Sequence, residues 1–172
     1  AHAIFAGGCF WCVEADFDKV DGVLETVSGY IGGDVADPTY RQVVAGGTGH
    51  REAVRIAFDP DVVSYEALLD AFWHSVDPTD DGGQFCDRGF SYTTAIYALD
   101  GAQRAAAEAS KAAVRQDLAV EATIETPILD AAEFYRAEDY HQDYYEKNPA
   151  RYKFYRWSCG RNDRVREVWG ET

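Results

Sequence analysis

Residues 7–14 hold the side chains that could most readily do chemistry. They read Gly-Gly-Cys-Phe-Trp-Cys-Val-Glu, so Cys9 follows two glycines and Cys12 comes three positions later. A short apolar run precedes them, and residues 13–20 have a helical pattern. We expect Cys9 on a strand-to-helix turn, at or just before a helix N-terminus, where backbone N–H groups and the helix dipole stabilise a thiolate. Because the thiolate attacks electrophiles, Cys9 is predicted to be a nucleophile.

Composition and charge limit the possible functions. The 172 residues suit one domain, and a hydrophobic content of 47% is enough for a folded core. No apolar run approaches the roughly 18 residues of a membrane-spanning helix. The formal net charge is −14, which repels nucleic acid and anionic membranes. We expect a monomer whose charge serves solubility, with neither nucleic acid nor membrane as a partner.

The four cysteines indicate a reducing compartment. They are too few for a disulfide scaffold in a chain of this length, whereas a Cys-x-x-Cys pair with Cys86 and Cys159 elsewhere fits redox or metal chemistry. No secretory leader pattern is recognisable, so the cytoplasm is the expected location. The chain begins at Ala1 without a methionine, and a processed start therefore stays open.

The order of predicted elements indicates a mixed fold. Predicted strands cover 23–30, 51–58, 92–99 and 120–127, and predicted helices cover 65–75, 102–118 and 132–147. Ser64 and Asp100 are expected N-caps of two of these helices. Strands precede helices and lie between them without a simple βαβ series. This order predicts an α+β fold, built as a single-domain two-layer α/β sandwich with a mixed sheet over 1–172.

Several motifs together resemble the A type of peptide methionine sulfoxide reductase. In chain order they are Gly8-Cys9-Phe10-Trp11 followed by Glu14, Gly29-Tyr30-Ile31-Gly32-Gly33, Pro38-Thr39-Tyr40, Thr48-Gly49-His50-Arg51-Glu52, Phe72-Trp73 through Asp77-Pro78-Thr79, and Ala137-Glu138-Asp139-Tyr140-His141-Gln142. The resemblance implies a ferredoxin-like arrangement of the sandwich. It also implies a family core over about 1–147, with 148–172 as a C-terminal tail that could carry a recycling cysteine.

The resemblance implies reduction of methionine S-sulfoxide, free or in oxidised proteins, to methionine. In the roles that it implies, Cys9 attacks the sulfoxide sulfur and Glu52 protonates or hydrogen bonds the sulfoxide oxygen. Further expected site residues are the hydrogen-bond donors Tyr40 and Tyr92, the pocket residue Asp87, and the apolar wall Phe10 and Trp11 that holds the methyl group. Without the motifs, Glu52 would be interpreted as a solvated acid at a strand end, and the two tyrosines as packing residues.

These residue types meet the needs of the reaction. A sulfoxide becomes a good electrophile at sulfur only when its oxygen is protonated or strongly hydrogen bonded, so the site needs a thiolate, a proton donor and an apolar holder. Glu52 can donate at neutral pH only if burial raises its pKa. The two tyrosines would act like an oxyanion hole. His50 and His141 are expected to be hydrogen-bonded structural histidines rather than bases.

The chain departs from the family pattern around Asp87 and at its C-terminal end. Cys86 and Ser91 stand where the family commonly has Asn and Gln, and the usual Gly-rich segment with resolving cysteines is not recognisable. Cys86 is expected to be a buried, inert thiol. The acidic residues within 138–143 are expected to form a solvated helix face.

Recycling needs a second thiol. A sulfenic acid on Cys9 condenses with a nearby thiol to a disulfide, which an external dithiol, expected to be thioredoxin, then reduces. Cys12 is the first candidate, because residues three apart at a helix start lie on one side and can pair. Cys159 is the second, since the family also uses C-terminal cysteines, and a relay from Cys9 through Cys12 to Cys159 stays open.

Other functions would use the same cysteines differently. A thioredoxin-like disulfide oxidoreductase would also carry Cys-x-x-Cys at a helix start, and it is the alternative function. A structural zinc site would need a second close pair of ligands, which the isolated Cys86 and Cys159 do not supply. A non-catalytic scaffold is hard to reconcile with the presence of Cys9 and Glu52 together. We expect no bound metal or cofactor.

Overall fold

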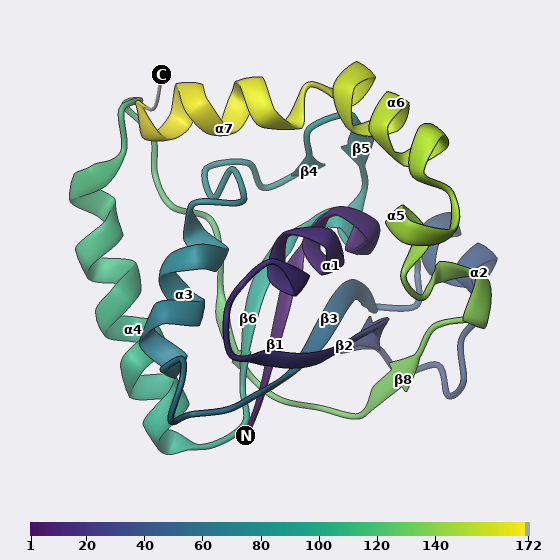
Figure 1. The fold of residues 1–172 in the computed structure, drawn as a ribbon, viewed down its shortest axis with the longest axis horizontal. Coiled ribbons are helices and arrows are strands. Elements are labelled where there is room, and N and C mark those ends of the chain that lie inside the picture. Colours follow the sequence, from purple (N-terminus) through teal and green to yellow (C-terminus); the bar gives the residue numbers. More distant parts are fainter. Residues whose placement is uncertain (171–172) are drawn as a thin grey trace.

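A six-stranded mixed sheet supports the candidate site in the computed structural model, which describes residues 1–170 (Figure 1). Its strands, in spatial order, are β7 (Ile128–Asp130), β6 (Thr94–Ala98), β1 (His2–Gly7), β3 (Arg51–Phe58), β2 (Val23–Ile31) and β8 (Phe134–Arg136). β6 and β7 are parallel, and the other neighbours are antiparallel. Two short strands, β4 (Gly83–Gln84) and β5 (Asp87–Arg88), form a separate hairpin. The predicted α+β class and mixed sheet are confirmed.

The sheet buries a large core on one face and a smaller one on the other. The alternation of β3 places Val54, Ile56 and Phe58 in the large core, as expected from period-two patterning. Ala53 and Tyr97 belong to the smaller cluster of buried residues. The central strand β1 is buried from Ala3 onward, so it can deliver the residue that follows it to a fixed position.

Helices α1 (Phe10–Asp18), α3 (Tyr65–Trp73) and α4 (Gly101–Val114) share the large core with the sheet, and Val43, Val168 and Trp169 of two further helices also belong to it. The expected caps are present, because the Ser64 hydroxyl accepts a hydrogen bond from the Ala67 N–H and the Asp100 carboxylate accepts one from the Gln103 N–H. A short helix, α2 (Tyr40–Ala45), begins with a capping box made by Thr39.

The last part of the chain forms helices that run along one edge of the molecule (Figure 1). They are α5 (Tyr144–Lys147), α6 (Pro149–Cys159) and α7 (Arg161–Trp169), and Gly160, with φ +75°, separates the last two. Trp169 is buried, and its indole N–H donates to the carbonyl of Val76 at 3.1 Å. Among the described residues, none of the helices combines the length and apolarity that crossing a membrane requires.

Two predicted elements are wrong. The run 120–127 is irregular, and the strand begins after it as β7. Residues 132–147 are not one helix, because β8 pairs with the edge of β2 and the Gln142 amide bridges the backbone N–H and C=O of Ser28, at 2.9 and 2.8 Å. This segment then makes a 3-10 turn, η3 (Asp139–His141), and the short helix α5. Tertiary pairing outweighs the local helical propensity here.

Candidate active site

Cys9 lies where the sequence predicts, on the turn between β1 and α1. It is the N-cap of α1, and its carbonyl accepts hydrogen bonds from the N–H groups of Cys12 at 3.1 Å and Val13 at 3.3 Å. Gly8 has φ +87°, and a Cβ there would lie 2.6 Å from Cβ of Gln84, so the turn requires glycine. The helix starts at Phe10, three residues earlier than expected.

Glu52 lies at the start of β3 and reaches the backbone of Phe10, the residue after Cys9. Its side chain is 1% exposed, and Oε1 accepts a hydrogen bond from the Phe10 N–H at 3.2 Å. Oε2 is buried and has no hydrogen-bond partner among the described residues. Burial raises the pKa of Glu52 well above its usual value, and the Phe10 bond opposes only part of that shift. A carboxylic acid in this state can donate a proton at neutral pH.

Tyr40 and Tyr92 bring their hydroxyl groups together, 3.4 Å apart. Tyr40 begins α2, and Tyr92 ends the 3-10 turn η1 (Phe90–Tyr92). Burial raises the pKa of Tyr40 to about 12 and also raises that of Tyr92, with the charge of Glu52 contributing to both shifts. Both tyrosines are therefore donors at neutral pH, as a site that stabilises a developing negative charge on oxygen requires.

Phe10 and Trp11 form an aromatic wall at the start of α1, with Phe10 in the core and Trp11 half-buried. The Trp11 ring stacks on Tyr144, with centroids 3.8 Å apart, and its Nε1–H donates to Nδ1 of His141 at 3.0 Å. Burial lowers the pKa of His141 to about 4, so its ring is neutral. His50 is also buried and accepts a hydrogen bond from the Gly33 N–H. Both histidines have the structural surroundings expected of them.

Cys9 and Cys12 are buried free thiols that belong to the same cluster of buried residues. Interaction with the Cys9 side chain lowers the pKa of Cys12 to about 7, and the positive charges of Arg161 and Arg156 add to the effect. Burial raises the pKa of the Cys9 thiol. This direction is opposite to the lowered pKa expected for Cys9 at a helix N-terminus.

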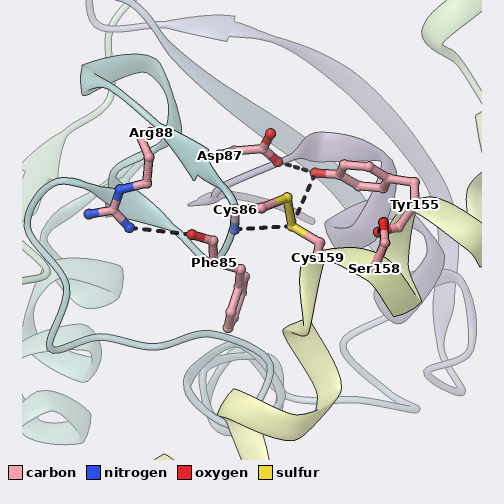
Figure 2. The surroundings of a disulfide bond; sticks show 7 residues. All are labelled: Phe85, Cys86, Asp87, Arg88, Tyr155, Ser158 and Cys159. Atoms are coloured by element: carbon pink, nitrogen blue, oxygen red, sulfur yellow. Dashed lines mark hydrogen bonds between the residues drawn. A yellow bond between two sulfur atoms is a disulfide. The ribbon is translucent and has the colours of Figure 1, made fainter.

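Cys86 and Cys159 form a disulfide, so the expectation of a buried, inert Cys86 thiol is wrong (Figure 2). Cys86 is exposed on the turn between β4 and β5, and Cys159 is the last residue of α6. The Cys86 N–H also donates to the sulfur of Cys159 at 3.1 Å. Sulfur and carboxylate ligand atoms of Cys86, Asp87 and Cys159 cluster within 4.8 Å, but in this state the two sulfur atoms are bonded to each other.

Asp87 lies at the expected site, with a partner that the sequence did not indicate. Its carboxylate accepts a hydrogen bond from the Tyr155 hydroxyl of α6. Burial raises the pKa of Asp87, and Arg161 opposes the shift. Arg161 is only 2% exposed and donates to the carbonyls of Gly7 and Ser75 at 3.1 and 2.9 Å. The sequence of the C-terminal segment did not indicate that Tyr155 and Arg161 belong to the site.

Two acids support the site from outside it. Glu138 accepts from the Tyr30 hydroxyl at 2.8 Å and from the Tyr40 N–H at 3.0 Å, so it is not on the expected solvated helix face. Glu14 is fully buried in α1 and accepts from the Asp143 N–H at 2.6 Å. Burial raises the pKa of Glu14 to about 7. Both glutamates lie within motifs that resemble the family, and this was the only indication in the sequence that they support the site.

The comparisons with known proteins cover almost the whole chain. A family model described as peptide methionine sulfoxide reductase matches residues 1–172. The chain is 56% identical over 170 residues to peptide methionine sulfoxide reductase MsrA 2 of Rhizobium meliloti, covering 99% of this chain and 84% of that protein. It is 51% identical over 168 residues to MsrA of Bacillus subtilis, covering 98% and 95%.

Solved structures agree with these sequence matches. Reduced Mxr1 of Saccharomyces cerevisiae superposes with a TM-score of 0.82 at 28% identity, covering 87% of this chain and 86% of that one. Methionine sulfoxide reductase A of Corynebacterium diphtheriae has a TM-score of 0.77 at 33% identity, covering 86% and 74%. A structure of Mxr1 in complex with Trx2 has a similar fold, with a TM-score of 0.60 at 21% identity over 84% of each chain.

Proposed function

The chain belongs to the peptide methionine sulfoxide reductase family, and we propose that Cys9, Glu52, Tyr40 and Tyr92 carry out its reaction. The protein is an oxidoreductase that reduces methionine sulfoxide to methionine. One observation carries the assignment of residues. A buried acid with an unpartnered oxygen is hydrogen bonded to the residue that follows the nucleophile. That arrangement supports Glu52 as the proton donor for a sulfoxide that reacts at Cys9.

In the proposed reaction, the sulfoxide oxygen occupies the space beside Oε2 of Glu52 and the two tyrosine hydroxyls. Donation from these groups makes the sulfoxide sulfur electrophilic, and Cys9 attacks it as the thiolate. The net change is Cys9–SH plus R–S(=O)–CH3 giving Cys9–SOH plus R–S–CH3. Asp87 contributes to the polar side of the site, and Phe10 with Trp11 holds the methyl group.

We propose that Cys12 resolves the sulfenic acid. Cys9–SOH and Cys12–SH condense to a Cys9–Cys12 disulfide and water. The burial of the two cysteines in one cluster and the lowered pKa of Cys12 support this order. Exchange with the thiols of Cys86 and Cys159 then leaves Cys9 and Cys12 reduced and the outer pair oxidised, which is the distribution seen here. Cys159 would thus act after Cys12, as a relay.

An external dithiol would reduce the outer disulfide, whose Cys86 is exposed. The solved complex of Mxr1 with Trx2 supports a reductant of the thioredoxin type. We further propose specificity for the S epimer, action on both free and protein-bound methionine sulfoxide, a monomeric state and a cytoplasmic location. The order β6-β1-β3-β2, with α1 and α3 as connections, supports the ferredoxin-like arrangement. Residues 148–172 then contribute the outer redox cysteine.

A thioredoxin-like disulfide oxidoreductase is the alternative function. Dithiol exchange has no sulfoxide oxygen to protonate, so it would not require the buried acid Glu52. The test of the proposed function is turnover of each epimer of N-acetylmethionine sulfoxide amide with dithiothreitol and with a thioredoxin system. We expect reduction of the S epimer with both reductants. Reduction of insulin without reduction of either sulfoxide would overturn the proposal.

A further inference from the structure

Tyr155 links the outer disulfide to the reaction site. It lies one helical turn before Cys159 on α6, and its hydroxyl donates to the carboxylate of Asp87, the residue after Cys86. The same hydroxyl lies 4.0 Å from the sulfur of Cys159 (Figure 2). The disulfide and the Tyr155–Asp87 bond therefore join the same two elements, α6 and the β4–β5 hairpin, one residue apart on the hairpin side.

The Tyr155 ring packs close to the buried cysteines of the reaction site. It packs against the cluster of buried residues that contains Cys9 and Cys12, and it meets the Trp11 ring edge-on with centroids 5.8 Å apart. Cys9 is 6% exposed. Tyr155 thus contacts the aromatic wall on one side and Asp87 on the other. A methionine sulfoxide side chain must bring its sulfur against Sγ of Cys9, which this packing leaves almost fully buried.

We propose that Tyr155 controls access to Cys9 and that the redox state of Cys86 and Cys159 controls Tyr155. The disulfide holds the Tyr155 ring over Cys9, and reduction of the disulfide releases the ring so that substrate can enter. This inference rests on the proposed function. A single hydrogen bond to Asp87 contributes little net stability. A covalent link next to it removes the freedom of the hairpin to move away from α6, so the bond is maintained.

The release step is a thiol–disulfide exchange. A dithiol R(SH)2 and the Cys86–Cys159 disulfide give RS2 and two cysteine thiols, so two electrons pass from the reductant to the outer pair. While the outer pair is oxidised, Cys9 and Cys12 have no dithiol to which they can pass a new oxidation. The closed site would then prevent a second sulfoxide from reacting until the outer pair has been reduced.

The test compares the accessibility of Cys9 in the two redox forms. Wild-type protein with an intact Cys86–Cys159 disulfide, and protein fully reduced and freed of reductant, are treated with iodoacetamide, and alkylation of Cys9 is followed by peptide mass spectrometry. If the open form is a minor population while the disulfide is intact, Cys9 should react about tenfold or more slowly in that form. With the disulfide intact, Y155A should react as fast as reduced wild type.

Trp157 offers a matched control, because it is on the same helix and 77% exposed. W157A should keep the slow alkylation of Cys9 in the disulfide form. C86S, which cannot form the disulfide, should react quickly under all conditions. Equal rates in the two wild-type forms, or slow alkylation that persists in disulfide-bonded Y155A, would overturn the proposal.

A second readout follows the substrate itself. One equivalent of methionine sulfoxide is added to the disulfide-bonded protein without reductant, and the rate of methionine formation is measured. Wild type should be slow, and Y155A should approach the rate of the fully reduced protein. A reduced protein that forms no methionine would contradict the proposed function, whatever the alkylation shows. Normal turnover with equal alkylation rates would contradict only the role of Tyr155.

Discussion

The backbone N–H of Phe10 donates a hydrogen bond to Oε1 of Glu52 at 3.2 Å, which ties the first residue of α1 to the start of β3. The two residues are 42 positions apart in the chain. The bond fixes one carboxyl oxygen and leaves Oε2 as the group free to act on a substrate. It also places that carboxyl beside Cys9, the N-cap of the same helix.

Replacing Glu52 with Gln removes the proposed proton donor but keeps an oxygen that can accept from the Phe10 N–H. We expect kcat to fall by about 10²–10³, the usual effect of losing one preorganised donor, with a smaller change in KM. E66Q changes an exposed glutamate and should behave as wild type. Steady-state kinetics of the two variants make the comparison, and normal turnover by E52Q would remove Glu52 from the mechanism.

The raised pKa of Glu52 predicts the pH dependence of the chemical step. Burial favours the protonated acid, so the donor is present below the pKa of Glu52 in the folded protein and is lost as pH rises through it. Single-turnover rates for the fully reduced protein should therefore decline on the alkaline side, and E52Q should lack that decline. An identical alkaline limb in E52Q would assign the ionisation to another group.

Removing either tyrosine hydroxyl removes one of the two donors proposed for the sulfoxide oxygen. Y40F and Y92F should each lower kcat by about tenfold or more, and the double variant should lose about 10²–10³, because both hydroxyls remain protonated at neutral pH. Y140F alters a tyrosine that is 55% exposed and serves as the control. If the double variant kept its single-turnover rate, the two hydroxyls would be packing groups only.

Burial of Glu14 makes stability depend on pH. Its pKa is raised to about 7 in the folded protein from an ordinary value of 4.5, so the native state retains a proton that the unfolded state loses. The contribution is fully present below pH 4.5 and is lost as pH rises to about 7. E14Q cannot titrate there, so its free energy of unfolding relative to wild type should increase by about 3 kcal/mol over that interval.

Urea unfolding under reducing conditions at several pH values measures this difference. E25Q, which alters an exposed glutamate of β2, should stay parallel to wild type. A constant gap between E14Q and wild type from pH 4.5 to 8 would mean that the Glu14 carboxyl does not change protonation with unfolding in this range.

Part of the site could be predicted from the residues themselves. The glycines and apolar run before Cys9 indicated its place on a strand-to-helix turn, and the cap of α1 is at that residue. The alternation of residues along β3 also indicates on which face of the strand Glu52 lies. Glu52 is two residues before Val54 and four before Ile56, so its side chain lies on the face of β3 that contributes to the large core. The motifs were needed to identify it as functional rather than solvated.

The rest depends on contacts that local patterns do not encode. Cys86 and Cys159 are separated by 73 residues, and their pairing requires α6 to lie over the β4–β5 hairpin. The place of Tyr155 follows from the same packing. Residues 134–136 form a strand only because the edge of β2 is available to pair with them. A helical composition in that segment could not reveal this partner.

The order of the thiols can be read directly from a disulfide map. Fully reduced protein is given one equivalent of methionine S-sulfoxide and quenched at increasing times. We expect a Cys9–Cys12 disulfide first, because these thiols share one buried cluster and the pKa of Cys12 is lowered, and a Cys86–Cys159 disulfide later. A Cys9–Cys159 disulfide with Cys12 still free would show that Cys159 is the first resolver.

The most direct test of the central claim is a single turnover of C12S and C9S, each fully reduced, with one equivalent of methionine S-sulfoxide and dimedone present. We expect C12S to form methionine and to carry a dimedone adduct on Cys9, because its sulfenic acid lacks the neighbouring thiol. C9S should form no methionine. Methionine formation by C9S at the wild-type rate would contradict the assignment of Cys9 as the nucleophile.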